Sequence, residues 1–575
     1  MMVFATLARA RTAPTPSERA HALVANMSLD EKLEMLHGPT DSNASHVCNT
    51  SAECAFVGNV RGNTRLGIPP LNMNDGPQGF RARGIAPPGT STAWPSGLAI
   101  AATFDSNLAY DWGAGIGREF VGKGGNLMLG PGLCVARVPR NGRIFEYLSG
   151  EDPALGALLA PAAVHGIQSN RVVANVKHWV LNSQESNRHG VSEEASERAR
   201  FEVYYPPFAA AVSAGVGSVM CSYNRIDQVY SCGNAHTLAG DLKGRLRFGG
   251  FVISDWRATR STASLLAGLD IEQPSASFLN ASAVKTLIAS GAAKEADVDD
   301  AVVRILTSLI AVGAMDAPPG TWDWRKLRAN VSSAQSIASA RRLAARSLVL
   351  LRNREWYDQQ HGNQQLKDQL KDQLKDQLKD RQLKDQPRAL LPLDTAGLSS
   401  IALIGRCGNG SVVSGGDSGY VAPSYLSTVL DAVTNHVASA GVNVSYTDGT
   451  DLKAAAALAQ SHTVAIVCAD TESSEGDDRA SLSLDDGCDD CPGNTRAQNA
   501  LIYAVAAANP NSVVLLSVPG AVLTPWRASV GAILVGFMAG QQYGAAVVDV
   551  LFGDSNPSAR LPLTFPDSEN QTQLT

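Results

Sequence analysis

Short apolar runs that alternate with helix-like segments dominate residues 16–315 of this 575-residue chain. Each run is followed by glycine or polar residues and then by a segment with helical periodicity. The strand-like runs are LNMNDGPQG, NLMLGPGL, VVANVKHWV, GVGSVMCSYN and GFVISDW. Strands that alternate with helices over about 300 residues indicate a parallel sheet, and a (β/α)8 barrel is the fold of compatible size. We therefore predict an α/β chain whose residues 16–318 form a TIM-like barrel.

A second alternation of strands and helices follows, and we predict a separate α/β sandwich domain over residues 388–566. Its strand-like runs are SIALIGRCG, TVAIVCADT, SVVLLSVPG and AILVGFMAG. Their nearly continuous apolar character is typical of a sheet that is covered on both faces. Residues 567–575 would form a tail.

Between the two predicted domains, residues 319–387 are expected to be a linker. Its first part, SAQSIASARRLAARSLVLLRN, predicts a helix that runs into a strand, and its second part repeats Leu-Lys-Asp-Gln over 364–386. Leucines four residues apart drift around a helix and form no continuous apolar stripe. A coiled coil would need a 3.5-residue period, so we expect an exposed insertion rather than a segment that binds a partner helix.

Composition excludes two classes of partner. The formal net charge is −6 and charged residues make up 18% of the chain, which does not fit the basic face of a nucleic-acid binder. No apolar run is long enough for a membrane span, so we expect neither a nucleic acid nor a membrane as partner. The oligomeric state is not predicted.

Three features favour secretion. Residues 1–15 have the apolar character of a truncated signal segment, although the arginines follow the apolar part instead of preceding it. Close pairs among the nine cysteines suit short disulfide-closed loops: Cys48 with Cys54, Cys221 with Cys232, and Cys488 with Cys491. Eight glycosylation sequons begin at Asn26, Asn43, Asn49, Asn280, Asn330, Asn409, Asn443 and Asn570. No second cysteine pair has zinc-site spacing, so we expect no metal.

Polar residues gather where the predicted strands end, which is where a TIM-like barrel places its active site. They are Asp75, Lys177, His178, Tyr223 and Asp255. In the second domain, Glu475 lies in the polar loop DTESSEGDDRASLSL after a predicted strand. Two carboxylates that face one cleft are what glycoside hydrolysis requires. Residue types alone also allow turn carboxylates, a packed tyrosine and a structural Arg143–Glu146 ion pair.

Motifs in both domains resemble glycoside hydrolase family 3, β-glucosidase type. The resemblance covers roughly residues 20–350 and 388–566, and its motifs occur in the family's order. They are RLGIPPLNMNDGPQGFR, TAWPSGLAIAATFD, ARVPRNGRIFEYLSGEDP, ANVKHWVLNSQESNR, VMCSYNRI, GFVISDW, GLDIEQP, GGDSGYVAP and LFGDSNPSARLPLTFP.

The resemblance implies a role for each candidate residue and requires no cofactor. Asp255 would be the nucleophile of a retaining reaction on a β-glucoside or oligosaccharide, and Glu475 the acid/base, with their carboxyl groups about 5 to 5.5 Å apart. Substrate-binding roles are implied for Asp75, Arg143, Lys177, His178, Arg188, Tyr223 and Trp256. We expect the cations Lys177 and Arg143 to lower the pKa of Asp255, and partial burial to keep Glu475 protonated.

Some positions depart from the family pattern. Arg257 and Arg260 follow the Ser-Asp-Trp motif where the family usually has glycine and histidine, and the fibronectin-like C-terminal domain of many relatives is expected to be absent. A β-xylosidase, another β-glycosidase or a catalytically impaired carbohydrate-binding protein therefore remain alternatives. A dinucleotide-dependent enzyme is disfavoured because GRCGNG lacks the full glycine spacing.

Overall fold

The first sheet of the computed structural model contains the five strands predicted for the first half of the chain. The structure describes residues 13–39, 54–354, 389–485 and 497–571. Strands β2 to β9 of this sheet run parallel to their neighbours, and β1 pairs antiparallel with β2. In spatial order the strands are β1 (Gly58–Val60), β2 (Leu71–Asp75), β3 (Leu127–Leu129), β4 (Val173–Trp179), β6 (Ser218–Cys221) and β9 (Phe251–Ile253). Every residue of these strands is buried, which explains their apolar sequences.

The predicted (β/α)8 barrel is not confirmed, because the described residues place six strands in this sheet and one of them is antiparallel. Beyond β9 the sheet continues only as isolated parallel bridges, from Ile253 to Ile271 and from Glu272 to His37. These contacts are too short to count as strands. The coarser prediction, an α/β fold with a mainly parallel sheet, is confirmed.

Helices follow the strands in the order that the alternation predicted. Those of the first half are α1 (Pro16–Val24), α2 (Leu29–Leu33), α3 (Gly97–Thr103), α4 (Ser106–Gly122), α5 (Pro153–Gln168), α6 (Glu197–Ala199), α7 (Pro206–Ser213), α8 (Ala281–Ala289) and α9 (Glu295–Ala311). A π-helix, η5 (His236–Arg245), precedes β9. A small separate sheet contains β5 (Ser192–Glu193), β7 (Arg225–Ile226) and β8 (Val229–Tyr230).

The second sheet has six strands, and all but its β10 edge pair in parallel. In spatial order they are β10 (Val349–Asn353), β15 (Ala532–Gly536), β14 (Ser512–Ser517), β13 (Val464–Asp470), β11 (Ser400–Ile404) and β12 (Asn443–Thr447). Its helices are α12 (Val429–Val437), α13 (Leu452–Gln460), α14 (Gln498–Ala508) and α15 (Tyr543–Leu551). The segment predicted as linker therefore contributes an edge strand to this sheet.

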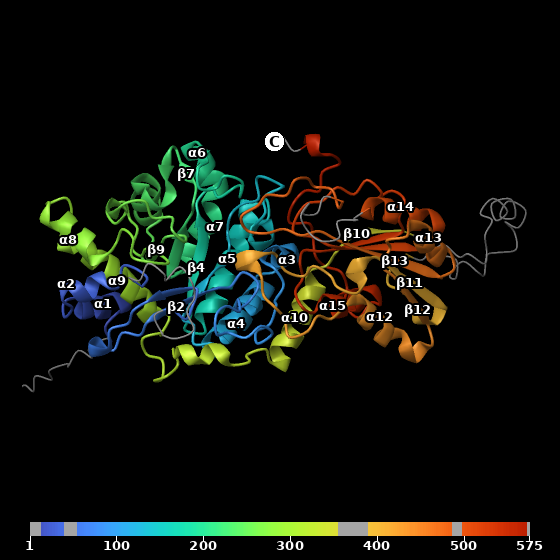
Figure 1. Cartoon of the computed structure of the whole chain (residues 1–575), viewed down its shortest axis with the longest axis horizontal. Coiled ribbons are helices and arrows are strands. Elements are labelled where there is room, and N and C mark those ends of the chain that lie inside the picture. The colour runs from blue at the N-terminus through green and yellow to red at the C-terminus, as the bar shows by residue number, and fades with distance from the viewer. Residues whose placement is uncertain (1–12, 40–53, 355–388, 486–496, 572–575) are drawn as a thin grey trace, which may run out of the picture.

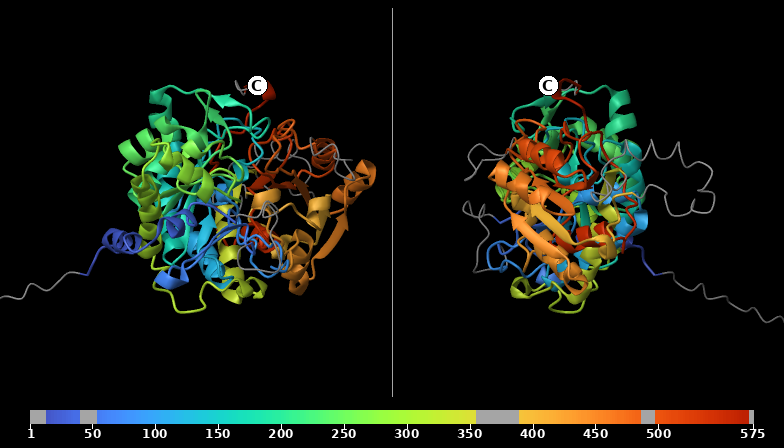
Figure 2. Two further views of the ribbon diagram at one scale, coloured as in Figure 1. Left: turned by 60° about the vertical axis from the view of Figure 1, so that its left-hand side comes forward. Right: turned by 90° about the vertical axis from the view of Figure 1, so that its right-hand side faces the viewer.

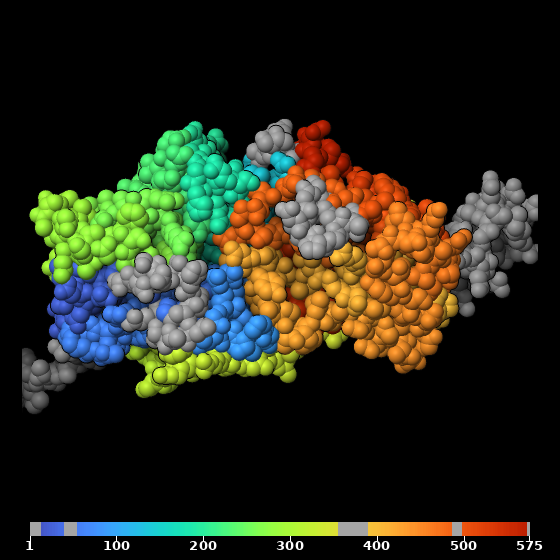
Figure 3. All heavy atoms as spheres, viewed as in Figure 1, coloured from blue at the N-terminus to red at the C-terminus, as the bar shows by residue number. Residues whose placement is uncertain are grey.

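Helix α10 (Ala334–Ser347) joins the two halves and packs on α3 and α4 of the first and on α15 of the second. The halves lie side by side (Figure 1), stay so in the turned views (Figure 2), and meet along a shared border in the space-filling view (Figure 3). The Leu-Lys-Asp-Gln repeat lies outside the described residues. Within the described part of the chain, no helix is both long and apolar enough to cross a bilayer.

Two disulfides join described cysteines. Cys221–Cys232 closes a short loop after β6, as predicted, whereas Cys407–Cys468, which ties the turn after β11 to β13, was not predicted. Cys54 is also disulfide-bonded. The predicted partners Cys48, Cys488 and Cys491 lie outside the described residues.

Candidate active site

Loops from both halves converge on one cavity of about 170 Å³. The carboxyl ends of the parallel strands of the first sheet form its floor, and two loops of the second domain complete its wall. All nine residues predicted for the site line it: Asp75, Arg143, Lys177, His178, Arg188, Tyr223, Asp255, Trp256 and Glu475. Val57, Arg81, Arg83, Met220, Asp417 and Ser418 complete the lining.

Asp255 lies at the end of β9, where the buried strand opens into the cavity. Its Oδ1 accepts a 2.7 Å hydrogen bond from the backbone N–H of Trp256. Its Oδ2 is buried and accepts no hydrogen bond within the described part of the chain, and His178 Nε2 lies 3.7 Å away. One carboxylate oxygen is thus fixed by the backbone, and the other is buried beside His178.

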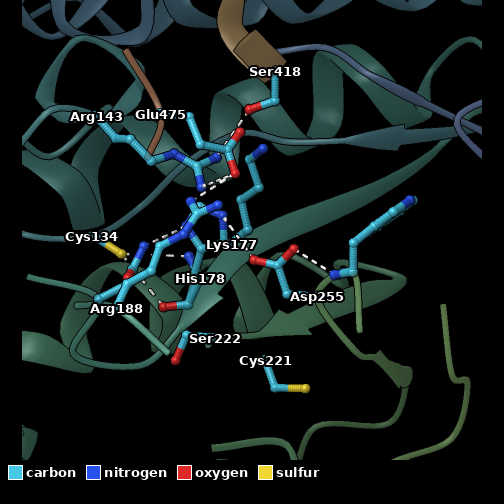
Figure 4. Close-up of polar contacts among 12 residues, drawn as sticks. Cys134, Arg143, Lys177, His178, Arg188, Cys221, Ser222, Asp255, Ser418 and Glu475 are labelled. Atoms are coloured by element: carbon cyan, nitrogen blue, oxygen red, sulfur yellow. Dashed lines mark hydrogen bonds and ion pairs between the residues drawn. The ribbon is translucent and has the colours of Figure 1, made fainter. Parts of the chain in front are cut away.

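Glu475 reaches the same cavity from the loop after β13. Its Oε1 accepts a 2.8 Å hydrogen bond from Arg188 Nη1 and lies 3.1 Å from Arg143 Nη1. In Figure 4 its carboxylate faces these guanidinium groups, while Asp255 lies lower in the view, beyond Lys177. Two residues of the first domain therefore hold a carboxylate supplied by the second.

Arg143 forms the buried ion pair with Glu146 that the sequence allowed, and it also belongs to the site. Its Nε and Nη2 contact Glu146 at 2.7 and 3.2 Å, and Nη2 also donates to Ser418 at 3.2 Å. Lys177 Nζ lies 3.4 Å from the same glutamate. Glu146 is fully buried, so its charge fixes both cations at the cavity wall.

Aromatic and amphipathic side chains shape the remaining wall. The guanidinium of Arg188 lies 4.4 Å from the ring centre of Tyr223. Burial raises the pKa of Tyr223, as do the charges of Asp255 and Glu475, so its hydroxyl stays protonated. Burial and nearby cations lower the pKa of His178, so its imidazole is neutral. Trp256 is half-buried and donates from Nε1 to the Val57 carbonyl at 3.3 Å.

At the far side of the cavity, Asp75 accepts a 2.9 Å hydrogen bond from Arg81 Nη1, and Arg81 also pairs with Asp417 of the second domain. Arg257 and Arg260, the residues that depart from the family pattern, are exposed and do not line the cavity. Arg260 lies 4.9 Å from the ring centre of Tyr230 instead.

In the free site, the net pKa shifts of Asp255 and Glu475 are opposite in direction to those we expected. Burial and the charge of Glu475 raise the pKa of Asp255 to about 6, and Arg143 and Lys177 only partly offset this rise. Burial alone would raise the pKa of Glu475, but Arg143, Arg188 and Lys177 together lower it. Arg143 and Lys177 do lower the pKa of Asp255, as expected, but burial and Glu475 outweigh them. The expectation of a protonated Glu475 was wrong because Arg143 and Arg188 contact Glu475 directly.

Several residues of the site were not predicted. Arg81, Asp417 and Ser418 line the cavity, and their signal was their position inside two of the motifs, RLGIPPLNMNDGPQGFR and GGDSGYVAP. Glu146 and Glu185 act from outside the cavity, by holding Arg143, Lys177 and Arg188. Among the described residues, no group of three or more His, Cys, Asp or Glu side chains could hold a metal ion.

Comparisons with known proteins agree with this geometry. The model of the glycosyl hydrolase family 3 N-terminal domain matches residues 38–308, and that of the family's C-terminal domain matches residues 383–575. A probable β-glucosidase L of Aspergillus fumigatus is 33% identical in an alignment of 528 positions that covers 88% of this chain and 67% of the relative. Thermostable β-glucosidase B of Acetivibrio thermocellus is 33% identical over 87% of this chain and 62% of its own length.

Solved structures show the same similarity. The β-D-glucoside glucohydrolase of Trichoderma reesei superposes with a TM-score of 0.81 at 29% identity, over 97% of this chain and 75% of that one. A β-glucosidase of Streptomyces venezuelae in complex with D-glucose gives a TM-score of 0.79 at 27% identity, over 96% and 78%. The two matched domain models together cover most of the sequence, and the chain belongs to glycosyl hydrolase family 3.

Proposed function

We propose that this chain is a retaining, exo-acting β-glucosidase that removes terminal β-D-glucosyl residues from the non-reducing ends of glucosides and oligosaccharides. The observation that carries the proposal is that Asp255 of the first domain and Glu475 of the second line the same cavity. A small, partly enclosed cavity suits one terminal sugar ring rather than the middle of a chain. Relatives named as β-glucosidases, and one solved with D-glucose, support glucose as that sugar.

In the first step Asp255, which lines the cavity, would attack the anomeric carbon with a carboxylate oxygen. The bond to the glycosidic oxygen breaks as Glu475 gives that oxygen a proton, and the glucosyl group becomes an ester of Asp255. In the second step Glu475 takes a proton from water, the hydroxide attacks the same carbon, and the Asp255 carboxylate leaves. Two inversions give retention of configuration.

The charges of the free site set a requirement for the first step. Arg143 and Arg188 hold Glu475 ionised before substrate binds. The glycosidic oxygen must therefore displace at least one of these contacts before Glu475 carries the proton. The pair already holds this proton on Asp255 at acidic pH, because that carboxyl has the higher pKa.

The remaining polar residues would orient the sugar through its hydroxyls. Asp75 would accept hydrogen bonds from sugar hydroxyls, and Lys177 would donate one to them. Arg81 holds the Asp75 side chain, and Glu146 holds that of Lys177. Charged hydrogen bonds between fixed groups and hydroxyls place the anomeric carbon against Asp255. Trp256 would form the apolar wall against one face of the ring.

We also propose that the protein is secreted and acts on cello-oligosaccharides released from cellulose. Two disulfides between described cysteines support an oxidising compartment. The sequon asparagines Asn26, Asn330, Asn409, Asn443 and Asn570 are exposed, as glycosylation requires.

The test is covalent labelling with a 2-deoxy-2-fluoro-β-glucoside that carries a good leaving group, followed by intact and peptide mass spectrometry. The fluorine slows both steps, and the good leaving group speeds only the first, so a 2-fluoroglucosyl ester of the nucleophile accumulates. We expect one adduct per chain on the peptide that contains Asp255. The Asp255→Asn variant, which keeps the side-chain shape, is the matched control and should remain unlabelled.

Two outcomes would overturn parts of the proposal. Labelling of Asp255 by the xylosyl analogue but not by the glucosyl reagent would make the protein a β-xylosidase. Folded protein that neither reagent labels, yet that binds glucose, would make it a catalytically impaired carbohydrate-binding protein.

A further inference from the structure

The loop that carries Glu475 is attached to the first domain by a carboxylate three residues further on. Asp478 Oδ1 accepts hydrogen bonds from the backbone N–H groups of Gly142 at 3.1 Å and Glu185 at 2.9 Å. Its Oδ2 accepts from the N–H of Ser186 at 2.9 Å. One side chain of the second domain thus binds three backbone donors on two separate loops of the first.

The attachment is reciprocal. Glu185, whose backbone donates to Asp478, returns its own side chain to the same loop, and its Oε2 accepts the N–H of Gly476 at 2.9 Å. The same Oε2 accepts from Arg188 Nη1 at 2.7 Å, and Arg188 Nη1 donates to Glu475 at 2.8 Å. We call this arrangement of Asp478, Glu185 and their backbone donors the reciprocal lock.

Two further hydrogen bonds, one on each side of Glu475, extend the lock. Ser473 Oγ donates to the Gly142 carbonyl at 2.5 Å, and the Arg479 N–H donates to the Arg140 carbonyl at 2.8 Å. A Cβ atom at Gly142 would lie 1.9 Å from the Asp477 carbonyl oxygen, so the two chains touch at their backbones. The position of Glu475 is therefore set largely by the first domain, which also carries the nucleophile.

We propose that Asp478 is the positioning residue for the acid/base: through the reciprocal lock it fixes the distance and direction of Glu475 relative to Asp255. The inference rests on the proposed function, since it assigns Asp478 to the acid/base half of that reaction. The physical reason is that a proton donor must lie within hydrogen-bond reach of the leaving oxygen, and a shift of about 1 Å is costly. Asp478 is not among the residues that line the cavity.

The test compares leaving groups in the Asp478→Ala variant, which loses all three acceptor contacts. A 2,4-dinitrophenyl glucoside needs no proton from Glu475 to depart, whereas cellobiose does. We expect kcat/KM for cellobiose to fall about 10- to 100-fold, which is at most the low end of the roughly 100- to 10,000-fold that a positioned acid contributes. We expect kcat/KM for the activated glucoside to change less than about threefold. Asp478→Asn keeps one acceptor oxygen, so its kcat/KM for cellobiose should lie between those of the wild type and Asp478→Ala.

A second readout separates positioning from a structural role. In the variant, the second step with the activated substrate lacks its base, so azide should raise kcat. Azide attacks the anomeric carbon of the glucosyl ester, the Asp255 carboxylate leaves, and β-glucosyl azide forms without any proton transfer. Partial unfolding would lower kcat/KM for both substrates by the same factor and would give no glucosyl azide.

The matched control is Asp477→Asn, which removes one negative charge at the neighbouring position. The Asp477 side chain is exposed and has no hydrogen bond within the described residues. It should behave like wild type. Two results for Asp478→Ala would overturn the inference while leaving the proposed function intact. One is an equal loss of kcat/KM for cellobiose and for the activated glucoside; the other is an unchanged ratio of these two kcat/KM values with no effect of azide. A wild-type protein that hydrolyses neither substrate would instead overturn the proposed function. If Asp478→Ala does not fold, the ratio of kcat/KM for cellobiose to kcat/KM for the activated glucoside, measured on Asp478→Asn, tests the inference instead.

Discussion

The pair Asp255 and Glu475 determines how activity should depend on pH. Burial and the Glu475 charge raise the pKa of Asp255 to about 6, while Arg143 and Arg188 keep Glu475 ionised to lower pH. In such a coupled pair the value of about 6 describes loss of the last shared proton. Retaining hydrolysis needs one proton on the pair. We expect kcat/KM for cellobiose to be highest on the acidic side and to fall as pH rises through about 6, measured across pH 3 to about 9.

Glu475→Gln provides the control for this interpretation. The variant removes the negative charge that helps to raise the pKa of Asp255, so this pKa should fall. With a 2,4-dinitrophenyl glucoside, which needs no acid, only the ionised form of Asp255 is required. The alkaline decline near pH 6 should then disappear, and the rate should fall only at a lower pH than about 6. An alkaline decline that persists in this variant would show that another group titrates there.

At the scale of elements, apolar continuity predicted most of the strands that are buried throughout, but it missed the short strand β1 and the polar strand β12. The runs that became β4 and β13 are buried throughout. Strand β12, Asn443–Thr447, is polar and half-exposed, so no apolar run marks it. The same limit applies to cysteines: the separation of 11 residues between Cys221 and Cys232 indicated a pair, whereas 61 residues between Cys407 and Cys468 did not.

Those two disulfides allow a matched comparison of stability. Closing a loop removes entropy from the unfolded chain, and the amount grows with loop length. The chain-entropy relation gives about 2.7 kcal/mol for the shorter loop and about 4.3 kcal/mol for the longer one. We expect Cys407→Ala/Cys468→Ala to lower the free energy of unfolding more than Cys221→Ala/Cys232→Ala, as measured by denaturant unfolding. The reverse order would show that native packing around Cys221 outweighs the loop entropy.

For the whole molecule, the sequence predicted two α/β domains and all nine proposed lining residues, but neither the strand number of the first sheet nor the charges of the site. Asp255 and Asp75 could be found because each lies at or just after the end of its own predicted strand. The contacts of Glu475 with Arg143 and Arg188 cross between domains, so they depend on how the domains pack. Local patterns do not contain that information.

One buried amide at the border between the domains allows a test of how far the site depends on the packing of the two domains. Gln78 is fully buried, and its Oε1 accepts the N–H of Gly415 at 2.9 Å, while its Nε2 donates to the Val413 and Met538 carbonyls of the second domain. Those carbonyls also accept from other backbone N–H groups, but the structure gives Gly415 no other acceptor. Gln78→Leu therefore leaves one buried donor unsatisfied.

We expect Gln78→Leu to lower the free energy of unfolding by about 2 kcal/mol, since an unsatisfied buried donor costs about 1–3 kcal/mol. Gly415 begins the segment that brings Asp417 and Ser418 to the cavity, so kcat/KM should fall as well. Denaturant unfolding and cellobiose kinetics measure the two effects. Gln460→Leu, the same change on an exposed helix end, is the control and should alter neither. A Gln78→Leu variant with wild-type stability and activity would mean that the contact between the domains does not depend on this amide.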